Sequence, residues 1–196
     1  NVWMKLKNSK KYKPIPFFYS FEQKIYRVPQ FLCLHHTVEE IEEKITLFSQ
    51  PGFFQELVRK QQDVFGKLNI QSENLEEQLF MPEEEKFEDI SKKYSFLFLG
   101  LHGGAGENGT IQKKLEDLGI AYNGPGPASS RLCMDKYETG LTIQNANIPG
   151  VTTAKKTVAD LTKKADEIWA QLEKENFKTP LILKPRGDGC SAGVIR

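Results

Sequence analysis

The chain has 196 residues, of which 39% are hydrophobic and 27% are charged, a balance typical of one large or two small folded domains. Its 27 basic and 26 acidic residues leave a net charge of +1, which gives no field for binding nucleic acid or an anionic membrane. No apolar run approaches the ~18 residues of a membrane span, and three cysteines without a CxxC pair favour reduced thiols over a disulfide framework or a zinc site, so we expect a cytoplasmic protein.

The N-terminal part of the chain carries clear local signals. Aromatic and β-branched residues cluster in Pro14–Ser20 and predict a strand. Residues 23–35 are predicted to hold a hairpin arm or two short edge strands. Thr37 is a good N-cap residue and Glu40 completes a capping box, so a helix is predicted from about Val38 to Phe48.

The middle of the chain changes from helical to strand character. Residues 54–78 have a helical composition, and the acidic segment 81–89 is predicted to be a solvated loop or helix edge. The apolar run Phe96–His102 predicts a central parallel strand that is buried on both faces. The elements expected next are a helix over 110–118, ending at Gly119, and a short strand over 120–123.

A Gly-Pro-Gly-Pro turn at 124–127 is the best candidate for a domain boundary. We therefore predict two domains, residues 1–126 with an α/β sheet and residues 127–196 with an α+β unit. The elements expected after the turn are a helix from Ser129 or Ser130 to about Asn145, a strand over 151–158, a helix over 159–175, a strand over 181–185, and a glycine-rich turn over 186–193 with its return strand. Because that hairpin would be left with an open edge, we expect the chain to be part of a longer protein.

Residues 104–109 match the dinucleotide-binding pattern GxGxxG between a predicted strand and a predicted helix. That type of site needs an acidic residue about 20 positions further on, which holds the ribose hydroxyls. The chain has no acidic residue between Asp117 and Asp135, and the next predicted strand ends at Asn123. A nicotinamide or flavin site is therefore disfavoured.

A different site is indicated by His102 and Glu107. His102 stands at the carboxyl end of the predicted strand, where open α/β sheets place their ligands. Glu107 lies in the following glycine-rich loop and could orient the imidazole or pair with a substrate ammonium group. A surface histidine in a flexible turn is the alternative that the residues alone leave open.

A second glycine-rich segment, Arg186–Gly193, lies near the C-terminal end of the chain. It lacks the GK[ST] ending of a Walker A loop, yet a glycine hairpin can close over phosphates with its backbone N–H groups, and Ser191 adds a hydroxyl donor. Lys184 ends the preceding apolar strand, and Lys136 lies on a predicted helix. These two ammonium groups could flank a nucleotide triphosphate as point charges, although a lysine such as Lys136 is more commonly part of a solvated helix face.

Together these segments resemble the D-alanine–D-alanine ligase family of ATP-grasp enzymes. The resemblance rests on His-Gly-x-x-Gly-Glu-x-Gly-x-x-Gln at 102–112, Gly-Ile-Ala-Tyr-Asn-Gly-Pro-Gly at 119–126, Met-Asp-Lys at 134–136, and Lys184-Pro185 followed by Gly-Cys-Ser-x-Gly. Their order and spacing are highly specific, whereas the likeness before residue 95 is faint.

The resemblance implies a parallel-sheet pre-ATP-grasp domain followed by the first α+β subdomain of an ATP-grasp domain. It further implies that Lys136 and Lys184 contact ATP phosphates, and that His102 and Glu107 lie near the first D-alanine. The loop residues implied to bind ATP are Gly187, Gly189, Cys190, Ser191 and Gly193, with Cys190 and Ser191 at catalytic positions. The Mg²⁺ ligands are expected beyond residue 196, and the full-length protein is expected to be a homodimer.

Two positions depart from the family pattern. Asn108 stands where the family usually has an aspartate, and Cys190 stands where it usually has the first of two serines. That serine belongs to a hydrogen-bond network at the substrate, and a thiol is a weaker donor than a hydroxyl. An altered substrate preference or a reduced activity is therefore expected.

The expected function is ATP-dependent ligation of two D-alanines through an acyl phosphate, for peptidoglycan precursor synthesis, with this chain alone inactive. Two alternatives stay open. One is an ATP-grasp ligase for another carboxylate–amine pair, and the other is a nucleotide-binding homologue without catalysis, which the substitutions at Asn108 and Cys190 mildly favour. The retained Lys136, Lys184 and Ser191 argue against the non-catalytic alternative.

Overall fold

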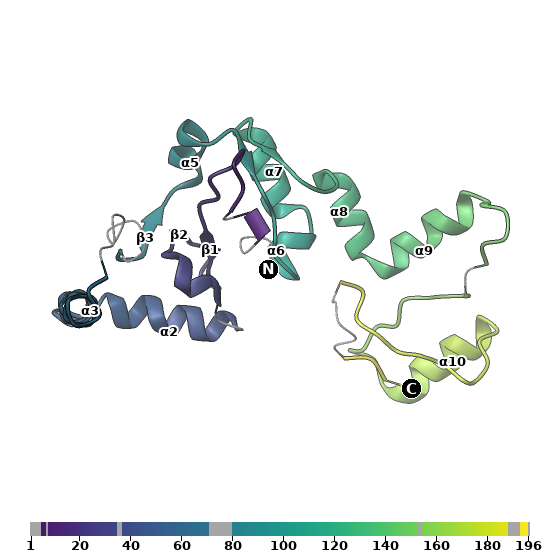
Figure 1. Ribbon diagram of the computed structural model, residues 1–196. Coiled ribbons are helices and arrows are strands. Elements are labelled where there is room, and N and C mark those ends of the chain that lie inside the picture. The colour runs from purple at the N-terminus through teal and green to yellow at the C-terminus, as the bar shows by residue number, and fades with distance from the viewer. Residues whose placement is uncertain are drawn as a thin grey trace. The chain divides into compact units, whose positions relative to one another are not determined.

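The computed structural model describes residues 5–6, 8–34, 37–70, 80–152, 154–187 and 193–195. It divides into two compact units, Asn1–Tyr94 and Ser95–Arg196, which are described separately (Figure 1). The domain boundary proposed from the sequence at 126/127 stays a prediction. Within the described ranges, no helix is long and apolar enough to cross a membrane.

The first unit contains a three-stranded antiparallel sheet in the order β1-β2-β3. Its strands are β1 (Phe17–Tyr19), β2 (Ile25–Arg27) and β3 (Glu83–Glu85). Strands β1 and β2 form a hairpin whose turn is closed by the Ser20 N–H donating to the carbonyl of Lys24. The strand and hairpin arm expected between residues 14 and 35 are thereby confirmed in part.

The core of this unit lies between the hairpin and the helical segments that follow it. The 3₁₀ helix η1 (Gln30–Leu34) buries Leu32 completely, against Phe18 and Val28. Helix α2 (Val38–Phe48) adds Ile41 and Ile45 to this cluster. The apolar side chains of the hairpin therefore meet the apolar face of α2, which is how a short sheet of this kind gains stability.

Helix α2 has the bounds and the cap that the sequence predicts. The Thr37 hydroxyl accepts a hydrogen bond from the Glu40 N–H at 3.2 Å, and the Glu40 carboxylate accepts one from the Thr37 N–H at 3.3 Å. Helix α3 (Phe53–Leu68) follows and ends at Asn69, which adopts a left-handed conformation. The helical character expected over 54–78 is confirmed as far as residue 68, whereas residues 71–79 lie outside the described ranges.

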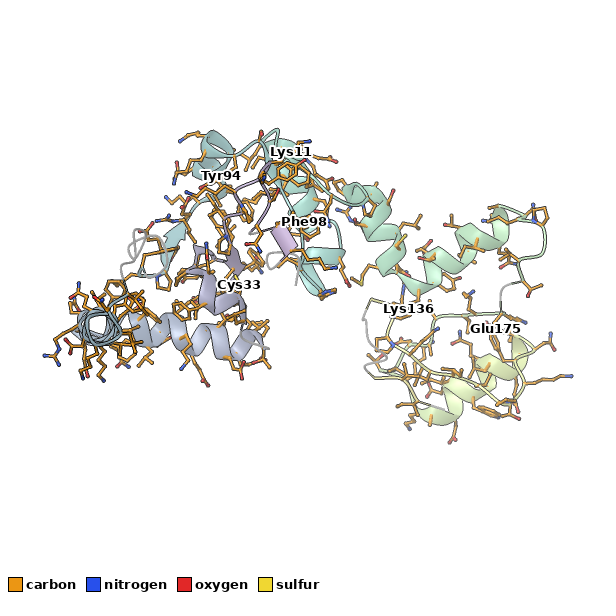
Figure 2. All side chains as sticks on the ribbon, viewed as in Figure 1. Lys11, Cys33, Tyr94, Phe98, Lys136 and Glu175 are labelled. Atoms are coloured by element: carbon orange, nitrogen blue, oxygen red, sulfur yellow. The ribbon has the colours of Figure 1, made fainter. Side chains whose placement is uncertain are left out.

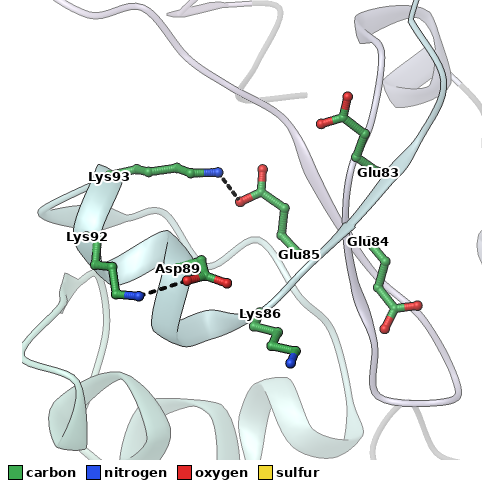
Figure 3. Close-up of a pocket in the computed structure, with 7 residues that line it drawn as sticks. All are labelled: Glu83, Glu84, Glu85, Lys86, Asp89, Lys92 and Lys93. Atoms are coloured by element: carbon green, nitrogen blue, oxygen red, sulfur yellow. Dashed lines mark hydrogen bonds and ion pairs between the residues drawn. The ribbon is translucent and has the colours of Figure 1, made fainter.

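The prediction that the acidic segment 81–89 is a loop or helix edge is wrong in one respect, because Glu83–Glu85 forms the third strand. This segment pairs with β2 along its length, and two exposed ion pairs accompany the pairing, Arg27 with Glu83 at 2.9 Å and Lys24 with Glu84 at 3.5 Å. The Glu85 side chain is only 8% exposed and lies 2.9 Å from the Lys93 ammonium. Lys93 ends the short helix α5 (Phe87–Lys93) (Figure 3).

The second unit begins with a parallel strand pair, β4 (Phe96–Leu97) and β5 (Ala121–Tyr122). The mixed α/β fold class is confirmed, but the expectation that β4 is long and buried on both faces is wrong. Phe96 is 52% exposed and Phe98 is 50% exposed. In the described part of the chain β4 pairs only with β5, so its faces lack the cover that a central strand receives.

The connection between β4 and β5 holds two helices, α6 (Gly104–Glu107) and α7 (Thr110–Asp117). Gly119 follows the C-cap of α7 with φ of +68°, which confirms its predicted role in ending that helix. The α7 side chains Ile111 and Leu115 are buried.

The remaining helices are α8 (Pro127–Met134), α9 (Lys136–Asn145) and α10 (Ala165–Lys174). The single helix expected up to Asn145 is wrong, because the chain is extended at Asp135 and starts a new helix there. The expected strand over 151–158 is also wrong, since its described residues form no strand. The expected strand over 181–185 and its return strand are reduced to one antiparallel bridge between Leu183 and Ile195.

Candidate functional site

His102 and Glu107 lie together in the second unit. The chain leaves β4 and turns at Gly103 and Gly104, which have φ of +73° and +45°, conformations that favour glycine. The short helix α6 then returns Glu107 towards His102, with 3.8 Å between Nδ1 and Oε1. The His102 side chain is 95% exposed and that of Glu107 is 45% exposed, so both can be reached by a ligand.

Gln112 of α7 holds the segment between His102 and Glu107 in place, a role that was not predicted from the sequence. Gln112 is 5% exposed, and its Nε2 donates a hydrogen bond of 2.7 Å to the carbonyl of Gly106. Gly106 itself lies so close to Leu101 that a Cβ there would be 2.4 Å from the Leu101 Cβ. The sequence signal for this role was the position of the polar Gln112 between two apolar residues of the predicted helix, Ile111 and Leu115, which are buried in the structure.

Gly109, which follows the His102–Glu107 segment, packs closely against the start of α8. Its φ is +90°, and a Cβ there would stand 2.4 Å from the carbonyl oxygen of Pro127, the first residue of α8. By its 1.5 Å rise per residue, α8 is about 12 Å long. The His102–Glu107 pair therefore connects to one end of α8, and Asp135 stands at the other.

Asp135 organises the start of α9, and this too was missed. Its Oδ1 accepts hydrogen bonds from the N–H groups of Tyr137 at 2.9 Å and Glu138 at 3.0 Å, the geometry of an N-cap. An aspartate followed three residues later by a glutamate was the sequence signal. Lys136, at the first position of α9, donates its backbone N–H to the carbonyl of Arg186 at 2.9 Å.

The Arg186 side chain turns back onto the same helix start. Its Nε lies 3.3 Å from Asp135 Oδ1, a second nitrogen pairs with Asp135 Oδ2, and that nitrogen is 3.5 Å from Glu138. The guanidinium also lies 5.4 Å from the centre of the Tyr137 ring. The hydrogen bond from Arg186, followed by those from the Glu138 and Tyr137 backbone, holds the pKa of the Asp135 carboxyl below its usual value.

The two ends of the second glycine-rich segment meet. Leu183 and Ile195 exchange backbone hydrogen bonds of 2.8 Å, and a Cβ on Gly193 would lie 2.9 Å from Pro185 Cγ. Lys184 is exposed between these two contacts, and the exposed Gly187 follows Arg186. Gly189, Cys190 and Ser191 lie outside the described residues.

The backbone therefore brings the two predicted lysines into one neighbourhood. Lys136 is hydrogen-bonded to Arg186, and Lys184 is two residues away, at most about 7 Å along the chain. Figure 2 shows Lys136 at the junction of α8 and α9. Two ammonium groups on adjacent segments can neutralise negative charges of a phosphate chain.

Two pockets in the first unit are lined by none of the predicted site residues. One of about 440 Å³ lies in the first unit among the acidic strand β3 and the lysines of α5 (Figure 3). Its charges pair with one another, as in Lys93–Glu85 and Lys92–Asp89. In the described ranges, no group of three or more histidine, cysteine, aspartate or glutamate side chains is placed to hold a metal ion.

Comparison with known proteins places these residues in a family. A family model described as the D-Ala–D-Ala ligase N-terminus matches residues 1–125, including the half where the sequence motifs are faint. A D-alanine–D-alanine ligase from Herminiimonas arsenicoxydans is 34% identical over 129 residues, covering 65% of this chain and 37% of the relative. One from Dechloromonas aromatica is 38% identical over 127 residues, covering 65% of this chain and 39% of the relative. The chain thus spans less than two fifths of the length of these relatives.

Two solved structures also match part of the chain. The crystal structure of a D-alanine–D-alanine ligase from Bacillus anthracis is 35% identical, with a TM-score of 0.45, and covers 57% of this chain and 35% of that one. A crystal structure of the ligase from Bacillus anthracis complexed with ATP has 31% identity and a TM-score of 0.38, and covers 55% of this chain and 34% of that one. By the family match over residues 1–125, the chain belongs to the D-alanine–D-alanine ligase family.

Proposed function

We propose that this chain is part of an ATP-dependent D-alanine–D-alanine ligase and that its second unit binds the ATP triphosphate and the first D-alanine. The observation that carries the proposal is the hydrogen bond of 2.9 Å between the Lys136 N–H and the Arg186 carbonyl. It holds two segments, distant in sequence, that each present a lysine. Family membership supplies the reaction class.

The chemistry explains why such charges are needed. A carboxylate resists attack by an amine because its negative charge repels the nucleophile and its oxygen is a poor leaving group. Transfer of the ATP γ-phosphoryl group to D-alanine gives an acyl phosphate, from which the amine of a second D-alanine displaces phosphate. Catalysis of such a transfer rests on positioning and charge neutralisation, here by Lys136, Lys184 and the Mg²⁺ that accompanies ATP.

His102 and Glu107 are proposed to hold the first D-alanine. The Glu107 carboxylate can pair with the substrate ammonium, while the imidazole at 3.8 Å is kept near it. Gly187, Gly193 and the intervening Gly189, Cys190 and Ser191 are proposed to cover the phosphates. The homodimer implied for the full-length protein stays a prediction.

The direct test is phosphate release by the full-length protein with MgATP and a panel of amino acids. Release with D-alanine, together with the D-alanyl-D-alanine product, supports the proposal. Release only with another carboxylate–amine pair means that the chemistry is right and the substrate wrong. No release with any pair, combined with MgATP binding, identifies a nucleotide-binding homologue without catalysis.

Two variants test the residue roles. Lys184→Ala removes one phosphate-binding charge and is expected to abolish most ATP-dependent turnover, while Lys178→Ala removes an exposed lysine of the same unit and should leave turnover intact. Unchanged affinity for ATP and unchanged turnover in Lys184→Ala would refute the assignment. Cys190→Ser restores the family's serine and is expected to preserve or raise activity, so a complete loss would mean that the thiol has a role of its own.

A further inference from the structure

Arg186 contacts the start of α9 through both its backbone and its side chain. Its carbonyl accepts from the Lys136 N–H, and its guanidinium pairs with both oxygens of Asp135 and approaches Glu138. A planar fork that meets both carboxylate oxygens fixes orientation as well as distance. One residue thereby joins the helix that carries Lys136 to the segment that carries Lys184.

Stability alone does not account for this arrangement. The Arg186 side chain is 48% exposed, and those of its partners Asp135 and Glu138 are 26% and 50% exposed, so solvent screens much of the contribution of these ion pairs to folding. The same contacts can nonetheless set the relative position of two backbone segments. A small displacement of a group that positions substrate is far more costly to a reaction than to folding.

The charges at this junction give Arg186 a second effect. Asp135 and Glu138 lie beside Lys136 and would repel a triphosphate that approaches its ammonium group. The guanidinium neutralises Asp135 directly and Glu138 at 3.5 Å. Removing it would both loosen the junction and expose two carboxylates to the incoming phosphates.

We infer that Arg186 is a positioning residue for ATP, which acts through Asp135 to hold the Lys136 and Lys184 segments at the spacing of a triphosphate. The inference rests on the proposed function of these two lysines. Arg186 itself is not assigned a contact with substrate.

The test uses full-length protein and steady-state phosphate release with separate titrations of ATP and D-alanine. Arg186→Ala is expected to raise the KM for ATP about tenfold, with the KM for D-alanine changed less than about twofold. Arg186→Lys keeps the charge but not the fork and should recover only part of this loss. The midpoint of thermal unfolding should fall by less than about 3 °C.

Asp135→Asn isolates the side-chain pair. Asparagine keeps a cap acceptor for the Tyr137 and Glu138 N–H groups but loses the charge and the second oxygen that Arg186 binds. It should raise the KM for ATP in the same direction as Arg186→Ala but by less, because it loosens the junction without leaving an unpaired carboxylate, and the double variant should be no worse than Arg186→Ala because both changes remove the same contact. Lys113→Gln, which breaks the exposed Lys113–Asp117 pair of α7, is the matched control and should change neither KM.

The outcomes separate this inference from the proposed function. If Lys184→Ala loses ATP use while Arg186→Ala keeps the wild-type KM for ATP, the proposed site stands and the positioning role is wrong. If Arg186→Ala lowers kcat without changing either KM, the residue merely maintains the amount of folded enzyme, and the positioning role is again wrong. If the wild-type protein does not bind MgATP by calorimetry, both proposals fail.

Discussion

Gln112 provides a sharp test of the structure around the His102–Glu107 pair. Its Nε2 donates to the Gly106 carbonyl, while its Oε1 is buried with no hydrogen-bond partner. Gln112→Glu replaces the donor by a group of the same shape that can donate to Gly106 only when it is protonated. Folding therefore favours the protonated carboxyl, and the pKa of Glu at this position is expected to be raised by burial.

The size of the stability change in Gln112→Glu follows from the linkage between its protonation and folding. Full burial can raise the pKa of a carboxyl by about 3 units, and each unit corresponds to about 1.4 kcal/mol. Below the unfolded pKa of about 4.3 the variant should be as stable as the wild type, because the group is protonated in both states. As the pH rises towards the folded pKa that stability is lost, until the variant is about 4 kcal/mol less stable above it. For a cooperatively unfolding domain of about 200 residues this corresponds to about 10 °C in the unfolding midpoint.

The assay is thermal unfolding of the full-length wild type and variant between pH 4.5 and 8, followed by circular dichroism. The control is Gln112→Met, which loses the hydrogen bond to Gly106 but also removes the unpartnered oxygen. These two effects, about 1 kcal/mol each, oppose one another, so its midpoint should differ little from the wild type at any pH. Parallel pH curves for Gln112→Glu and the wild type would mean that this side chain reaches solvent, contrary to the structure.

Three further predictions concern single elements. Thr37→Ala removes one half of the capping box of α2 and should cost about 1 kcal/mol, or about 2–4 °C in the unfolding midpoint, and no measurable change would contradict the cap. Gly109→Ala should lower the midpoint more than Gly119→Ala, because both have positive φ but only Gly109 faces a carbonyl oxygen at 2.4 Å from an added Cβ. With Cys190 replaced by serine, the exposed Cys133 should react with a maleimide at least about tenfold faster than Cys33, because burial raises the pKa of the Cys33 thiol. Equal rates would contradict that burial.

The helices with local end signals were the most predictable part of the fold. Helix α2 has the predicted bounds because Thr37 and Glu40 satisfy each other's backbone groups within the same turn. Gly119 ends α7 for a similarly local reason, its left-handed conformation. Such signals depend on neighbours in sequence, so no knowledge of the tertiary structure is needed.

The strands were harder to predict because their partners decide them. Glutamates have a low strand propensity, yet Glu83–Glu85 forms a strand because its backbone pairs with β2, a partner that lies far away in sequence. The apolar run at Phe96 predicts burial but does not specify the surface that provides it. In the described part of the chain β5 is its only strand partner, and half of the Phe96 surface stays exposed.

The site was predicted unevenly for the same physical reason. His102 and Glu107 are close in sequence, and a glycine turn between them suffices to bring them together. Lys136 and Lys184 were paired as possible phosphate-binding charges, but the contact between their segments was not predicted, since nothing local relates two segments so far apart. Arg186 and Asp135 make that connection in the structure. Both lie in segments that the sequence analysis singled out, but their pairing with each other was not predicted.

The start of α9 also restricts how the proposed site could hold a triphosphate. The first N–H groups of a helix have no partners within it and can bind an anion. In α9 the N–H of Lys136 donates to the Arg186 carbonyl, and those of Tyr137 and Glu138 donate to the Asp135 carboxylate. These donors are engaged, and a carboxylate already occupies the positive end of the helix dipole. A phosphate chain held at this helix must therefore be bound by the Lys136 ammonium group and not by the helix backbone, which is why the position of that side chain, set through Arg186, matters to the proposed reaction.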